Sequence, residues 1–195
     1  MLGPAAYQAR AQRATQQLQA LIARGKLEAS FVGTGDSVYM AEVAFSNPGN
    51  KPITLTLEPG MILRPPEGKR VQPLLVNHPT TLTLAAQTTL RVPLESFCMD
   101  SRVPAPGPYE PIDYAFKERA RQGGPEAVEV LRRSEALQLG ELEPYRRAII
   151  QLAIWKSMHQ PVGERQIQSV LGPYYYDSGL RQQVLQAASQ LARAP

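Results

Sequence analysis

The spacing of apolar residues changes twice along this chain, and these changes restrict the possible folds more than any other feature. Residues 5–25 are good helix formers with apolar side chains near one face. Residues 27–100 instead alternate apolar and polar side chains, which is typical of strands with one buried face. From about residue 113 the helical spacing returns. We therefore predict an N-terminal helix within residues 1–26, followed by a β-domain and a helical domain.

The predicted β-domain covers residues 27–100. Its apolar alternation is interrupted by turn-forming sequences such as "NPGNKP" at 47–52 and "RPPEGKR" at 64–70. Six or seven short strands at this spacing, with no helix between them, favour an antiparallel immunoglobulin-like β-sandwich.

A proline-rich linker and a small helical bundle are predicted to follow. The linker is "SRVPAPGPYEPI" at 101–112, which contains four prolines, and the helical domain is 113–195. Prolines, glycines and a capping serine at the expected ends define the helices. The candidate helices cover about residues 113–121, 125–137, 144–158, 163–171 and 178–192. The fold class predicted for the whole chain is α+β.

Few residues in the chain suit catalysis or metal binding. Cys98 is the single cysteine, so an intrachain disulfide and a multi-cysteine metal site are both excluded. The only histidines, His78 and His159, each lie beside a proline in a predicted loop. Neither GxGxxG nor GxxxxGK[ST] occurs. We therefore expect no cofactor, no metal and no ordinary enzymatic activity.

The charge pattern argues against nucleic-acid binding. Lysine and arginine number 21 against 17 acidic residues, which gives a net charge of +4 without any long block of like charge. No uninterrupted apolar run is long enough to cross a membrane. If Met1 is the native start, we expect a cytoplasmic protein; otherwise an export signal has been removed.

Gln151 is the most unusual polar residue in the chain. It lies within "AIIQLAIW" at 148–155, a segment predicted to be a helix that is apolar on almost all sides. A buried amide needs a hydrogen-bonding partner. We expect Gln151 to bind either strand-end backbone or a loop carbonyl of the β-domain, and so to latch the two domains together. Trp155 lies on the same helix face, and Cys98, in "SFCMD" at 96–100, is predicted to point inward at the end of the last strand.

The motifs "FCMD" at 97–100 and "QLAIW" at 151–155 resemble the two signatures of bacterial cell-surface thioester domains. "VQPLL" at 71–75 is similar to a glutamine-containing strand motif of that family. The resemblance implies that the Cys98 thiol attacks the Gln151 carboxamide, that ammonia leaves, and that the thioester then acylates an amine on a partner. Trp155 would pack one turn further along. The resemblance also implies a location on the cell surface or outside the cell. The same motifs resemble other poorly characterised modules of bacterial envelope proteins.

Three consecutive tyrosines, Tyr174, Tyr175 and Tyr176, form a candidate interaction surface between two predicted helices. The Ala/Gln-rich N-terminal helix favours self-association, so a protein partner or a homo-oligomer is expected. We interpret the chain as a non-enzymatic structural or adhesive module of a bacterial envelope. The alternatives are a Cys98–Gln151 thioester domain and a cytosolic module that binds protein or nucleic acid.

Overall fold

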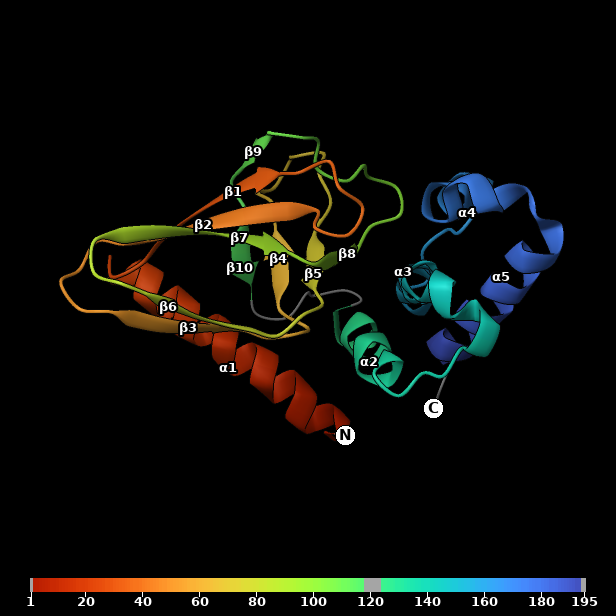
Figure 1. The fold of residues 1–195 in the computed structure, drawn as a ribbon, viewed down its shortest axis with the longest axis horizontal. Helices are drawn as coiled ribbons and strands as arrows, with labels where there is room; N and C mark the ends of the chain where they lie inside the picture. The colour runs from red at the N-terminus through yellow and green to blue at the C-terminus, as the bar shows by residue number, and fades with distance from the viewer. Residues whose placement is uncertain (1, 118–123, 194–195) are drawn as a thin grey trace.

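The protein has an α+β fold in which a β part is followed by a helical part (Figure 1). The computed structural model describes residues 2–117 and 124–193. Helix α1, Pro4–Ala23, confirms the predicted N-terminal helix. It packs against strands of the β part and against α2. Its buried face includes Tyr7, Ala11 and Leu18, so this helix is held by apolar burial.

In the described part of the chain, ten strands form three small sheets in which every pairing is antiparallel. The strands are β1 Glu28–Gly33, β2 Ala41–Asn47, β3 Ile53–Leu57, β4 Ile62–Arg64, β5 Leu74–Val76, β6 Thr80–Leu84, β7 Thr88–Leu94, β8 Ser96–Cys98, β9 Pro111–Ile112 and β10 Ala115–Lys117. Their orders are β7-β2-β1-β9, β10-β4-β5-β8 and β3-β6. The antiparallel pairing confirms the prediction made from the sequence. The immunoglobulin-like sandwich stays a prediction.

The alternation of apolar residues correctly places most of the β core. Ala41, Val43 and Phe45 are fully buried along β2. Tyr39 and Leu90 belong to the same apolar alternation in the sequence, but they are 46% and 39% exposed. Tyr39 precedes β2, and Leu90 lies on the edge strand β7, so neither is covered as fully as a residue inside the sheet.

The end of the predicted linker and the segment that follows it belong to the β part, where they form two strands instead of starting a helix. Strand β9 pairs with β1, and β10 pairs with β4. The helix predicted over 113–121 is therefore wrong at 115–117, and residues 118–121 lie outside the described part of the chain. Phe116 explains the difference, because its ring packs 5.6 Å from Phe31 and 6.2 Å from Phe45 between ring centroids. This aromatic burial outweighs the weak local helical pattern.

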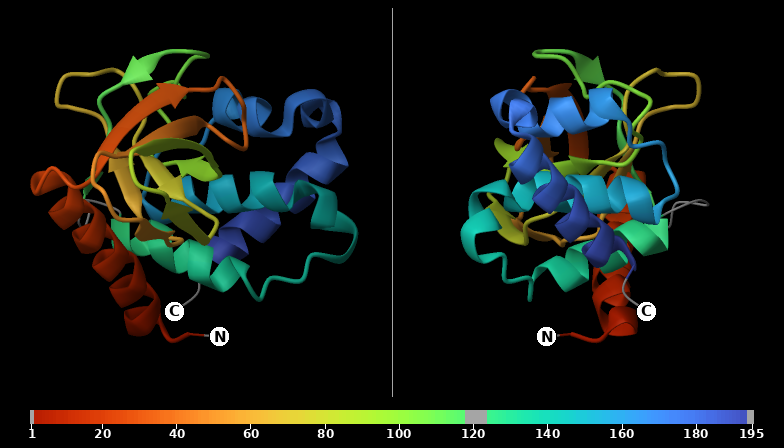
Figure 2. Two further views of the ribbon diagram at one scale, coloured as in Figure 1. Left: turned by 60° about the vertical axis from the view of Figure 1, so that its left-hand side comes forward. Right: turned by 90° about the vertical axis from the view of Figure 1, so that its right-hand side faces the viewer.

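Over the described residues 124–193, the helical part consists of four α-helices and two short 3-10 helices. They are α2 Gly124–Ser134, η1 Gly140–Tyr145, α3 Arg146–Ser157, α4 Glu164–Leu171, η2 Gly172–Tyr176 and α5 Ser178–Arg193. Helix α3 is central, since it contacts α2, α4 and α5 (Figure 2). Eight consecutive residues, 148–155, are buried along it. Pro144 was expected near the start of this helix but lies in η1. Among the described residues, no helix combines the length and apolarity needed to span a membrane.

Candidate functional site

The side-chain amide of Gln151 connects the helical part to the β part. Its Nε2 donates to the carbonyl oxygen of Cys98 at 2.8 Å, and its Oε1 accepts from the Cys98 backbone N–H at 2.9 Å. Only 4% of Gln151 is exposed. Both halves of the amide are therefore satisfied by one residue of the β part, which is the kind of strand-end partner that the sequence predicted.

Strand β8 provides this backbone because, among the described strands, only β5 pairs with it and its other edge is left open. It is the last strand of its sheet and pairs with β5, with Cys98 opposite Leu74. The Cys98 N–H and C=O point instead toward α3, where Gln151 takes the place of a neighbouring strand. A glutamine side chain carries one acceptor and one donor group, as a peptide unit does, so it can reproduce part of a ladder. This arrangement covers an edge that would otherwise be open to other strands.

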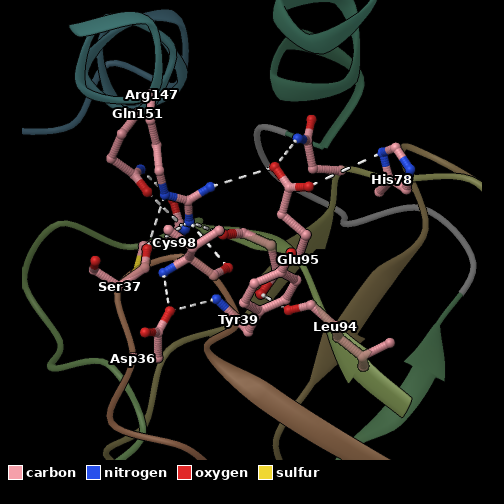
Figure 3. A network of polar contacts seen from close by, with 12 residues as sticks. Asp36, Ser37, Tyr39, His78, Leu94, Glu95, Cys98, Arg147 and Gln151 are labelled. Carbon is pink, nitrogen blue, oxygen red and sulfur yellow. Dashed lines mark hydrogen bonds and ion pairs between the residues drawn. The ribbon is translucent and has the colours of Figure 1, made fainter. Parts of the chain in front are cut away.

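Arg147, one helical turn before Gln151, reaches the same edge from α3 (Figure 3). Its Nε and Nη2 donate to the Ser37 carbonyl at 2.9 and 2.6 Å, and Nη2 also donates to the carbonyls of Val38 and Ser96. The guanidinium lies 4.5 Å from the centroid of the Phe97 ring. Burial lowers the pKa of Arg147, and the negative charge of the nearby Glu95 partly offsets this decrease. Arg147 therefore joins α3 to two separate segments of the β part.

Two further glutamines extend these contacts along the chain after β8. Gln160 accepts from the Ser101 N–H at 2.7 Å and donates to the Met99 carbonyl at 2.6 Å. Gln166 on α4 donates to the Ser101 carbonyl at 3.0 Å. We call the contacts of Arg147, Gln151, Gln160 and Gln166 with the backbone of residues 96–101 the clamp. The clamp fixes the helical part to one stretch of backbone through directional hydrogen bonds.

The Cys98 thiol lies inside the protein beside this clamp. Its Sγ is 3.3 Å from the Sδ of Met40, and Cys98 is 4% exposed. Burial raises the pKa of the Cys98 thiol to about 12, although Arg147 and a hydrogen bond with Gln72 act in the opposite direction. A thiol with such a pKa is almost entirely protonated at neutral pH and is a poor nucleophile.

A cleft of about 690 Å³ lies between the two parts and contains the centre of the clamp. Its β side is formed by the turn at 35–37 and the loop at 101–105, and its helical side by η1, α3, α4 and η2. Buried lining residues, Cys98, Gln151 and Trp155 among them, form its floor. The volume is in the range of ligand-binding pockets in proteins. The three residues that the sequence singled out, Cys98, Gln151 and Trp155, therefore line one cleft.

Trp155 contributes burial but no hydrogen bond to this floor. It is 4% exposed, and its indole Nε1 has no acceptor among the described residues. Its position one turn after Gln151 places it on the cleft side of α3.

The three tyrosines of η2 differ in their surroundings. Tyr174 and Tyr176 are 54% and 77% exposed, whereas Tyr175 is half-buried and is covered by Arg181 at 5.0 Å from the ring centroid. Tyr174 packs edge to face on Tyr145 with centroids 5.2 Å apart, and both rings line the cleft. The predicted interaction surface thus continues into the cleft.

Sequence reasoning missed Arg147, Gln160 and Gln166 as parts of the site. Arg147 shares a helix face with Gln151, and that spacing was an available signal. Gln160 follows the end of α3 and had no signal of its own, because its role depends on how the parts dock. His78 lies in the connection between β5 and β6 with its imidazole 69% exposed, 4.0 Å from Glu95. Within the described ranges, no cluster of three His, Cys, Asp or Glu residues could hold a metal.

The fold and site define an α+β protein whose two parts meet at a clamped cleft. In comparisons with known proteins, no family model, no curated protein and no solved structure matches this chain.

Proposed function

We propose that the chain is a non-enzymatic binding module that holds a protein partner in the cleft between its β part and its helical part. The observation that carries this proposal is the cleft of about 690 Å³, with a buried floor and an aromatic rim. The clamp supports it, because a site built across two parts binds well only when these parts are held in fixed positions. The proposal also includes the sandwich architecture, which rests on the strand spacing in the sequence, and the location in a bacterial envelope, which rests on the sequence motifs.

The tyrosines support a protein partner in particular. Tyr174 presents a large, rigid ring at the rim, and Tyr145 supports it from behind. Such rings bury much apolar area with little loss of conformational entropy, and they are enriched at protein interfaces. The buried Cys98 thiol, with its raised pKa, does not favour covalent catalysis at this floor.

A pair of variants on α4 tests the proposal. Ser169 and Gln168 are adjacent exposed residues, but only Ser169 lines the cleft. We would select binders to the full chain from a random-peptide display library and measure them on Ser169→Trp and Gln168→Trp. The proposal expects peptides that lose binding to Ser169→Trp and keep binding to Gln168→Trp. Failure to find any such peptide would overturn it.

The second candidate function is the thioester, which the contact between Gln151 and Cys98 favours. In this reaction the Cys98 S–H and the Gln151 C–N bonds break, an S–C bond forms, and ammonia leaves with the thiol proton. The intact mass would then be about 17 Da below that of the sequence, and methylamine would raise it by about 31 Da while freeing one thiol. An unmodified mass eliminates this candidate.

A further inference from the structure

The charged residues that line the cleft are mostly cationic. Arg102, Arg147 and Arg165 line it, with Asp36 as the one carboxylate in its lining among the described residues. The Asp36 carboxylate is already engaged, because its Oδ1 accepts from the backbone N–H groups of Val38 and Tyr39 at 2.6 and 2.8 Å. Arg147 lies 3.8 Å from a Glu95 carboxylate oxygen, and Arg102 is paired with Asp100. Within the described part of the chain, Arg165 is therefore the lining cation that remains to attract an anionic group of a ligand.

Two of these arginines come from opposite sides of the cleft. Arg102 follows β8 and belongs to the β side, whereas Arg165 belongs to α4. Arg102 forms two bonds of 2.9 Å with the Asp100 carboxylate, through Nε and Nη2. Arg165 is exposed and has no ion pair or hydrogen-bonded side-chain partner within the described part of the chain. Its guanidinium is thus free to bind a carboxylate in a forked geometry.

We propose that the cleft binds an extended, acid-rich segment of a protein partner, with Arg165 receiving a carboxylate and Tyr174 contacting the neighbouring apolar side chains. This inference rests on the proposed function and specifies the chemistry of the partner. A protein segment fits the cleft better than a nucleic acid, because a nucleic acid requires a continuous basic track. The cleft lining that the structure describes forms no such track, because its arginines are mixed with apolar and aromatic side chains.

A charge-reversal pair tests this inference. Arg165→Glu changes the cleft, and Arg13→Glu makes the same charge change at an exposed position of α1 outside the cleft lining. Both side chains are exposed, so we expect both variants to fold, and circular dichroism checks this. The probes are fluorescein-labelled peptides obtained from the display selection, each with a matched version in which Asp and Glu are replaced by Asn and Gln.

We call peptides that lose binding to Ser169→Trp but keep binding to Gln168→Trp cleft-dependent. The expected result is that these peptides carry net negative charge. Arg165→Glu should weaken their binding about tenfold, as should the amide-for-acid replacement, whereas Arg13→Glu should have little effect. Peptides that depend on the cleft but are neutral or basic, and that bind Arg165→Glu normally, would overturn this inference while leaving the proposed function intact. Oligothymidylate that displaces the peptides, and itself loses binding in Arg165→Glu, would also overturn it in favour of a nucleic acid.

Discussion

Gln151, in the middle of helix α3, hydrogen-bonds both backbone groups of Cys98, the last residue of strand β8. The two residues are 53 positions apart in the sequence and belong to different parts of the protein. Apolar packing alone tolerates small shifts, but a two-point hydrogen bond requires one register. The pair therefore fixes how α3 lies on the sheet edge and, with it, the shape of the cleft.

Replacing Gln151 should destabilise the protein. In Gln151→Ala the buried N–H and C=O of Cys98 lose their partners, which should lower the free energy of unfolding by about 2–3 kcal/mol. Gln168→Ala is the matched control, because Gln168 is exposed on α4 and its loss should change stability by less than about 0.5 kcal/mol. Urea denaturation followed by tryptophan fluorescence measures both. Equal stabilities for the two variants would mean that the amide does not hold the parts together.

Arginine should be required at position 147. A lysine keeps the positive charge but cannot reach the Ser37, Val38 and Ser96 carbonyls with one planar group. We expect Arg147→Lys to lower the free energy of unfolding by about 1.5–3 kcal/mol. Arg13→Lys, at an exposed position on α1, should have almost no effect. A stable Arg147→Lys protein would show that charge alone is sufficient there.

The Cys98 thiol should make stability fall in alkaline solution. Its pKa is about 12 in the folded protein, compared with an ordinary value of 9.0 that applies to the unfolded chain. The unfolded chain therefore releases the thiol proton at a lower pH than the folded protein does. The stabilisation is complete below pH 9.0 and decreases above it, by about 1 kcal/mol between pH 9.0 and about 10. Burial also raises the pKa values of Tyr7 and Tyr114, and both tyrosines are kept in the control, Cys98→Ala. Denaturation across this pH range should give a shallower decrease for Cys98→Ala, and parallel curves would contradict the assignment.

The two exposed tyrosines of η2 should differ in binding. Tyr174 lines the cleft, whereas Tyr176 does not, although both are exposed. Tyr174→Ser should lower the affinity for cleft-dependent peptides about tenfold, and Tyr176→Ser should leave this affinity nearly unchanged. Fluorescence anisotropy with the selected peptides measures the difference. A larger effect of Tyr176→Ser would move the interaction surface away from the cleft.

The sequence predicted the elements of this fold better than their assembly. Period-two alternation identified buried positions such as Val43, and the all-round apolar character of α3 predicted that the Gln151 amide is buried and paired. The strand at Phe116 was missed, because its burial depends on rings that are distant in the sequence. Gln160 was missed for the same reason, since nothing local indicates which polar side chain a docked helix will use.

Hydrogen exchange at the Gln151 side chain, followed by nuclear magnetic resonance, tests the clamp most directly. Its carboxamide protons should be visible and should exchange with deuterated water far more slowly than those of the exposed Gln168. Exchange as fast as that of Gln168 would contradict the clamp, and so would the absence of a Gln151 carboxamide signal, the latter pointing to the thioester.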